Sequence, residues 1–165
     1  MRDRLAQVPG VPVLHTDAMS QHPAEAVTPV GLHHVRLTVT DIVRSKAFYT
    51  TLLGSEPVID ESEHVDEPGV KESQQQFYGG CVFAVGSQVL GLRPVAEPGD
   101  TFSSTRVGLD HVGIQVDSRS DLDKAVERLD ADGVVHGEIT DIGSMVILSL
   151  QDPDDINLEL AFPKG

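Results

Sequence analysis

An internal repeat constrains the fold of this chain more than any other feature. Residues 31–39 (GLHHVRLTV) align with residues 108–116 (GLDHVGIQV) at a constant offset of 77 residues. The two segments share Gly, Leu, His, Val and a later Val, and both alternate apolar and polar residues. Such alternation is typical of a β-strand with one buried face. The repeat therefore predicts two copies of one structural unit, which a chain of 165 residues can pack around one core.

The same order of elements follows each of these strands. Asp41 and Gly54 suit the start and stop of a helix, and Ser120 and Gly133 have the same spacing of 13 residues. Short strand-like runs follow at 55–60, 76–85 and 88–93 in the first half, and at 134–139, 145–151 and 156–162 in the second. The order βαβββ, repeated twice, predicts an α+β fold.

The same pattern sets the expected organisation of the chain. Prolines and mixed polar residues without a regular period indicate an irregular N-terminal arm, in which His15 and His22 are expected to be solvated. The acidic stretch 61–75 has no counterpart in the second half and is expected to be a loop insertion. The expected parts are an arm (1–30), a first module (31–93), a linker (94–107) and a second module (108–162).

Charge and composition exclude several classes of partner. With 12 basic and 26 acidic residues, the net charge of −14 repels phosphate backbones and anionic lipids. We expect no nucleic-acid or membrane partner, since no apolar run approaches the roughly 18 residues of a membrane span. The N-terminus lacks a basic segment followed by an apolar stretch, so a cytoplasmic location is expected. Cys81 lies in an apolar run and is expected to be a buried thiol.

Strand alternation decides which side chains can share a site. Leu37 and its apolar neighbours in the first strand face the helices, so His34 points to the opposite face. The repeat places His111 on the matching face of its own strand. Aligning residues 90–92 (LGL) with 158–160 (LEL) places Gly91 and Glu159 at equivalent positions on the last strand of each half. Each half thus has two positions on one face whose side chains can share a site.

These features resemble the vicinal oxygen chelate superfamily, which includes glyoxalase I, extradiol dioxygenases and the fosfomycin and bleomycin resistance proteins. The resemblance covers about residues 31–162 and rests on the paired histidine-bearing strands and on the closing DPDDINLEL segment. It implies that the two modules form an open, cup-shaped mixed sheet with helices on its outer face. It also implies a homodimer and a divalent metal bound at the four positions filled here by His34, Gly91, His111 and Glu159.

Gly91 departs from the four-ligand pattern because it has no side chain to donate. This argues against glyoxalase I and methylmalonyl-CoA epimerase, which resemble one another in having Glu or Gln at that position. The two histidines and Glu159 remain, a set that the resemblance links to extradiol dioxygenases and fosfomycin-modifying enzymes. We expect a metal-dependent enzyme, of dioxygenase or lyase type, for a small oxygen-rich substrate, with Fe, Mn, Zn or Ni as the metal. A metal-free binding protein of the bleomycin-resistance type is the alternative.

Further residues are candidates for the pocket and for proton transfer. Arg36 and Arg93 are expected on the ligand face, where either could pair with a substrate carboxylate or form a surface ion pair. The other expected pocket residues are Thr38, Gln115 and Asn157. Tyr78, His136 and, in the insertion, His64 are candidates for proton transfer. His33 rivals His34, but alternation turns it to the other side and its repeat partner is Asp110.

Overall fold

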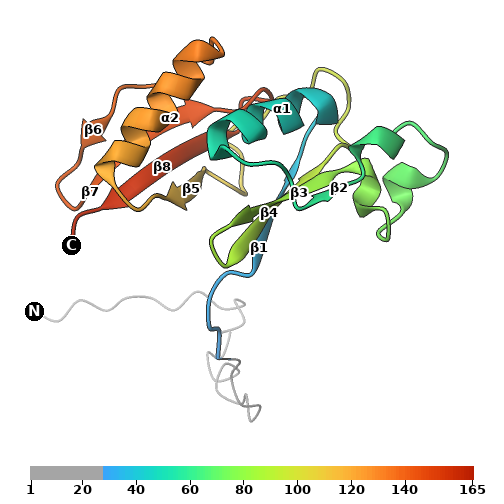
Figure 1. Cartoon of the computed structure of the whole chain (residues 1–165). Helices are drawn as coiled ribbons and strands as arrows, with labels where there is room; N and C mark the ends of the chain where they lie inside the picture. Colours follow the sequence, from blue (N-terminus) through green and yellow to red (C-terminus); the bar gives the residue numbers. More distant parts are fainter. Residues whose placement is uncertain (1–27) are drawn as a thin grey trace, which may run out of the picture. The chain divides into compact units, whose positions relative to one another are not determined.

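The computed structural model describes residues 28–165. The expected arm, with His15 and His22, lies outside the described residues except for its last three positions. The chain divides into two units, Met1–Gly31 and Leu32–Gly165, and the second unit contains both repeats. Figure 1 shows the helices and strands of this second unit.

The two repeats form two four-stranded mixed sheets of the same topology. The first repeat contains β1 (His34–Thr38), α1 (Ile42–Leu53), β2 (Ile59–Asp60), β3 (Cys81–Val85) and β4 (Gln88–Arg93), with strand order β1-β4-β3-β2. The second contains β5 (Val112–Gln115), α2 (Arg119–Ala131), β6 (Thr140–Asp141), β7 (Met145–Gln151) and β8 (Asn157–Pro163), with order β5-β8-β7-β6. In each sheet the first strand runs parallel to the last and the other pairs are antiparallel. The predicted α+β fold is confirmed.

Capping residues explain where the helices begin and end. The side chain of Asp41 accepts hydrogen bonds at the start of α1, and Gly54 ends the helix with a φ of 66°. Helix α2 is capped by Ser118, whose hydroxyl accepts from the N–H of Asp121, so the prediction of Ser120 as the cap was wrong. Gly133 takes the left-handed conformation, with a φ of 67°, at the other end. No helix in residues 28–165 is long and apolar enough to cross a membrane.

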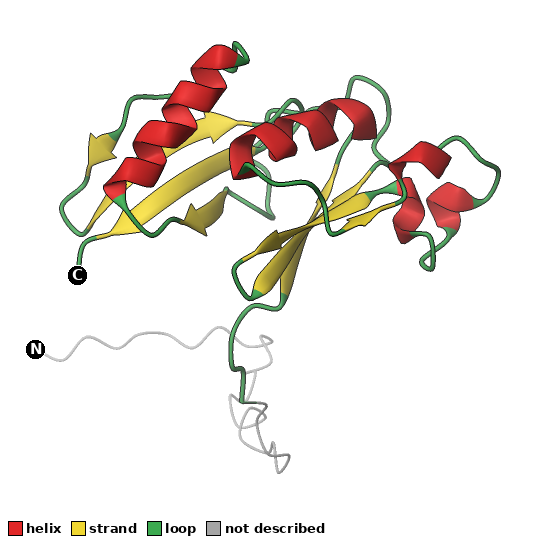
Figure 2. Ribbon diagram, viewed as in Figure 1, coloured by secondary structure: helices red, strands yellow, loops and turns green. Residues whose placement is uncertain are grey.

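Both helices lie on one side of the strands, where they cover the apolar faces (Figure 2). Tyr49 of α1 and Leu122 of α2 are completely buried, and they belong to one core that includes strand residues such as Leu37, Leu92 and Leu148. Burial of these apolar side chains provides the main stabilisation of such a fold. The opposite face of each sheet is left for polar side chains.

The insertion is more ordered than a plain loop, and it shortens the next strand. It contains the 3-10 turns η2 (Ser62–His64) and η3 (Val70–Glu72) and is followed by η4 (Phe77–Gly79). The strand predicted to begin at residue 76 begins only at Cys81, because η4 carries three consecutive positive φ angles. Gly80 then approaches β4 so closely that a Cβ atom there would lie 1.9 Å from the carbonyl oxygen of Leu92.

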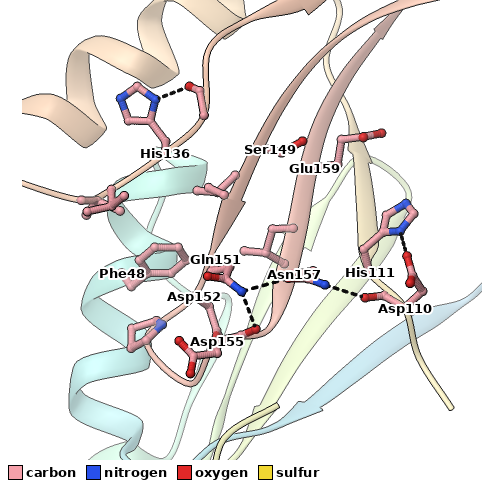
Figure 3. Close-up of a pocket in the computed structure, with 16 residues that line it drawn as sticks. Phe48, Asp110, His111, His136, Ser149, Gln151, Asp152, Asp155, Asn157 and Glu159 are labelled. Carbon is pink, nitrogen blue, oxygen red and sulfur yellow. Dashed lines mark hydrogen bonds and ion pairs between the residues drawn. The ribbon is translucent and has the colours of Figure 1, made fainter. Parts of the chain in front are cut away.

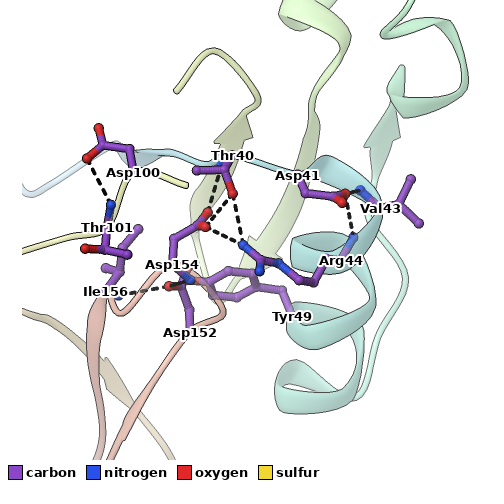
Figure 4. A network of polar contacts seen from close by, with 10 residues as sticks. All are labelled: Thr40, Asp41, Val43, Arg44, Tyr49, Asp100, Thr101, Asp152, Asp154 and Ile156. Atoms are coloured by element: carbon purple, nitrogen blue, oxygen red, sulfur yellow. Dashed lines mark hydrogen bonds and ion pairs between the residues drawn. The ribbon is translucent and has the colours of Figure 1, made fainter. Parts of the chain in front are cut away.

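The turn between β7 and β8 links the second repeat to the first (Figure 4). The buried carboxylate of Asp154 accepts hydrogen bonds from the N–H and the hydroxyl of Thr40 at 2.8 and 2.6 Å. It also accepts one from the guanidinium of Arg44 at 2.5 Å. The buried carboxylate of Asp152 accepts one from the Tyr49 hydroxyl at 3.1 Å. Two carboxylates of one turn therefore fix the start and the middle of α1.

Candidate functional site

The strand register shows that Gly91 and Glu159 are equivalent positions. Arg36 on β1 lies beside Gly91 on β4, and Gly113 on β5 lies beside Glu159 on β8. His34, the first residue of β1, lies two residues before Arg36, and His111, directly before β5, lies two residues before Gly113. In the first sheet the charged residue, Arg36, is on the first strand and the glycine is on the last. In the second sheet the glycine is on the first strand and the charged residue, Glu159, is on the last.

The exposed face of the second sheet carries a hollow of about 820 Å³ (Figure 3). His111, directly before β5, and Glu159 on the neighbouring strand β8 both line it. Asn157 lies next to them and donates a hydrogen bond to the carbonyl oxygen of Asp110 at 3.2 Å. No ion pair in residues 28–165 involves the half-buried Glu159. Its carboxylate is thus available to a ligand in the hollow.

The two strand histidines differ in how their rings are held. Nδ1 of His111 lies 2.6 Å from the carboxylate of Asp110, which favours the tautomer with the proton on Nδ1 and leaves the Nε2 lone pair free. Nδ1 of His34 lies 3.0 Å from Nδ1 of His33, and the two rings meet edge to face. His33 precedes β1, so strand alternation does not turn its ring away from His34.

The structure brings together only part of the expected metal site. Within residues 28–165, no three His, Cys, Asp or Glu side chains gather closely enough to hold one metal ion. His111 and Glu159 share the hollow of the second sheet, whereas His34 lies on the first sheet. Two imidazoles and one carboxylate suit a divalent metal such as iron, so the residue types fit. One chain alone does not assemble all three.

The expected pocket residues lie in different places. Asn157 lines the hollow with His111, but Thr38 and Gln115 line other, smaller hollows of about 260 and 520 Å³. Arg36 and Arg93 lie on the first sheet, where both contact the ring of Tyr78. The pocket that strand alternation predicted is therefore divided between the two sheets.

His136 lines the hollow, and hydrogen-bond acceptors flank both nitrogens of its ring. Nδ1 donates to the carbonyl oxygen of Gly137 at 2.7 Å, and Nε2 lies 3.3 Å from the carboxylate of Asp130. The carbonyl of Gly137 and, to a smaller degree, Asp130 raise the pKa of His136 above its ordinary value. Both ring nitrogens therefore face hydrogen-bond acceptors, which fix the orientation of the ring beside the hollow.

Two other reactive side chains lie away from this hollow. His64 is exposed in the insertion and pairs with the carboxylate of Glu67 at 2.8 Å, which raises the histidine pKa. Cys81 is buried, and its burial raises the thiol pKa to about 12, so it is not a nucleophile at neutral pH. The prediction of a buried thiol is confirmed.

Sequence reasoning missed Ser149 and Gln151, which line the hollow from β7. Ser149 lies beside Glu159 in the register, and Gln151 donates a hydrogen bond to the Asn157 side chain at 3.1 Å. The signal was present, because Leu148 is buried among the core residues of β7. Alternation along that strand places the intervening polar residues on the open face.

A family model, the Glyoxalase/Bleomycin resistance protein/Dioxygenase superfamily, matches residues 31–160. A solved glyoxylase/bleomycin resistance protein/dioxygenase domain from Frankia sp. EAN1pec is 29% identical, with a TM-score of 0.65, over 83% of this chain and 100% of that chain. A lactoylglutathione lyase from Agrobacterium tumefaciens is 19% identical, with a TM-score of 0.57, over 81% of this chain and 94% of its own. The chain matches no curated protein.

The fosfomycin resistance protein FosX from Listeria monocytogenes is 18% identical, with a TM-score of 0.58, over 83% of this chain and 96% of its own. At this identity FosX and the Agrobacterium lyase show a shared fold. The match to the family model shows family membership, because it spans both βαβββ repeats and most of the described residues. The chain therefore belongs to the Glyoxalase/Bleomycin resistance protein/Dioxygenase superfamily.

Proposed function

We propose that this chain is a cytoplasmic, metal-dependent enzyme that acts on a small oxygen-rich organic substrate and works as a homodimer. The observation that carries the proposal is the hollow of the second sheet, where His111 and Glu159 lie together without an ion-pair partner for the carboxylate. Asp110 orients the His111 ring by accepting from Nδ1, as carboxylates beside metal-binding histidines do. Nε2 of His111 and the Glu159 carboxylate would hold a divalent ion such as Fe, Mn, Zn or Ni.

The third protein ligand in this proposal is His34. Because His34 lies on the other sheet of its own chain, a second copy would supply it by placing its first sheet against the hollow. Three protein ligands leave coordination positions for substrate oxygens, and the metal would act there as a Lewis acid. The proposed site is thus incomplete without the partner copy.

The polar lining of the hollow supports an oxygen-rich substrate. Ser149, Gln151 and Asn157 offer a hydroxyl and two amides, which can donate to or accept from substrate hydroxyl and carbonyl groups. His136, whose ring is oriented by two hydrogen-bond acceptors, is a candidate to donate a proton to a substrate oxygen or to orient it.

A metal-free binding protein of the bleomycin-resistance type is the second candidate. It is favoured by one observation, that no three ligand side chains gather within the described part of one chain. In that case the hollow would enclose a ligand through hydrogen bonds and apolar contact alone. The two candidates differ in metal content.

The test combines metal analysis with mixed dimers. We expect wild-type protein incubated separately with Fe, Mn, Zn or Ni to retain at least one of them after gel filtration. His111→Ala and Glu159→Ala should each lower the affinity at least about tenfold, as loss of a direct ligand does. His64→Ala, which alters an exposed histidine paired with Glu67, is the matched control and should retain the metal.

A mixed dimer of a His34→Ala chain and a Glu159→Ala chain tests whether the site is shared. If each site combines residues of both copies, one of the two sites in the mixed dimer is intact, and half of the wild-type metal content returns. If each chain builds its own site, the mixed dimer binds none. Wild-type protein that retains none of the four metals would support the metal-free binding protein instead.

A further inference from the structure

Two arginines on the open face of the first sheet lack carboxylate partners, although the chain has 26 acidic residues and only 12 basic ones. Arg44 and Arg119 each form an ion pair, but no carboxylate of residues 28–165 pairs with Arg36 or Arg93. The Nε atom of Arg93 is buried and has no hydrogen-bond partner among the described residues. A buried donor of this kind normally has an acceptor.

Both guanidinium groups lie against the ring of Tyr78. The guanidinium carbon of Arg93 lies 3.9 Å from the centre of the Tyr78 ring, and that of Arg36 lies 5.5 Å from it. A cation over an aromatic ring is stabilised by the electrons of its face. The ring therefore stabilises both cations on the open face of the first sheet.

The backbone that presents Tyr78 is strained and held in place by close packing. Phe77 and Tyr78 have φ angles of 48° and 61°, which non-glycine residues rarely adopt. The N–H of Tyr78 donates to the carbonyl oxygen of Ser73 at 2.9 Å. A Cβ atom at Gly79 would lie 2.8 Å from Cα of Val65, so the chain approaches the insertion as closely as glycine allows. Strain retained by surrounding structure is often found at binding sites.

Gly91 leaves room for Arg36. A Cβ atom at Gly91 would lie 3.3 Å from Nε of Arg36 and 3.6 Å from its Cγ, so the arginine side chain extends over β4. At the equivalent position of the second sheet β8 carries the Glu159 carboxylate. The first sheet therefore places positive charge where the second sheet places negative charge.

We propose that Arg36 and Arg93 bind an oxyanion, the carboxylate or phosphoryl group of the substrate, on the open face of the first sheet beside His34. Guanidinium groups fit such anions because their N–H groups can donate two parallel hydrogen bonds. A bound anion would also provide counter-charge for two cations that have no carboxylate partner among the described residues. The identification of this anion as substrate rests on the proposed function, whereas anion binding itself needs no metal.

The test follows the Nε–Hε NMR signals of the arginines while inorganic phosphate, methylphosphonate or glycolate is added at low ionic strength. We expect at least one probe to shift the signals of Arg36 and Arg93. Arg36→Gln and Arg93→Gln should each weaken binding about tenfold, as loss of one charge-assisted pair does. The matched control is Arg119→Gln, an exposed arginine that pairs with Asp123, which should bind as the wild type does. Tighter binding of glycolate would assign a carboxylate, and tighter binding of phosphate or methylphosphonate a phosphoryl group.

Gly91→Ala gives a second, independent test. The added methyl group should displace the Arg36 side chain and weaken anion binding several-fold, with an unchanged circular dichroism spectrum. The proposal is overturned if none of the three probes shifts the arginine signals, or if both arginine variants bind as the wild type does. The titrations are done on protein treated with a chelator and repeated with the retained metal. Anion binding without metal binding would overturn the metal site alone, and metal binding without anion binding would overturn this inference alone.

Discussion

Asp154→Ala is the sharpest test of how the two repeats are joined. The Asp154 carboxylate accepts three hydrogen bonds, two from Thr40 and one from Arg44, and all three are lost in the variant. The part-buried N–H of Thr40 is left without its acceptor, which costs about 1–3 kcal/mol. Because the Arg44 side chain is 50% exposed, its ion pair adds at most about 1 kcal/mol. We expect the free energy of unfolding to fall by about 3 kcal/mol.

Urea unfolding followed by circular dichroism measures this change. Asp154→Asn retains one acceptor oxygen and should lose less than Asp154→Ala. The control is Asp123→Ala, which removes an ion pair between two half-exposed side chains on α2 and should change stability by less than about 0.5 kcal/mol. A loss below about 1 kcal/mol for Asp154→Ala would refute the view that this turn holds the repeats together.

Two further predictions concern Asp152 and Gly80. Burial raises the pKa of Asp152, and a carboxyl group with a raised folded-state pKa contributes stability that is present below its unfolded pKa and lost as pH rises through the folded pKa. At pH 7, Asp152→Asn should therefore unfold near the urea concentration that unfolds the wild type. On acidification, the free energy of unfolding of the wild type should rise relative to that of the variant. Equal pH profiles for the two proteins would contradict this. Gly80→Ala should lower the free energy of unfolding by at least about 2 kcal/mol, because its Cβ atom would lie 1.9 Å from the carbonyl oxygen of Leu92. Gly113→Ala, with no atom within 4 Å of the new methyl group, is the control in the same assay, and an equal loss in both variants would contradict the steric argument.

The order of elements and the buried faces could be predicted because they depend on local patterns. Alternation along the first strand predicts that Leu37 faces the helices and Arg36 the open side, and the structure has Leu37 buried and Arg36 exposed. The equivalence of Gly91 and Glu159 could be found from the repeat, because a parallel pair of strands keeps the same register in both copies.

The features that could not be predicted depend on contacts between distant residues. The late start of β3 follows from the approach of Gly80 to Leu92 and of Gly79 to Val65, which no local pattern encodes. The division of the expected site between two sheets has the same origin. Alternation shows that His34 and His111 lie on the open faces of their strands, but it does not show how far apart the two sheets hold them.

Arg36 extends over Gly91 in the first sheet, where the second sheet carries Glu159, and this difference in charge bears on how two copies of this chain would associate. A pair that placed two first sheets face to face would bring four arginines together around two Tyr78 rings, a geometry that like-charge repulsion opposes. A pair that placed a first sheet over a second sheet would instead bring Arg36 and Arg93 opposite the unpaired Glu159. If two copies associate through these faces, charge favours the unlike pairing over the like one, and a few side chains rather than the shape of the fold would select the assembly.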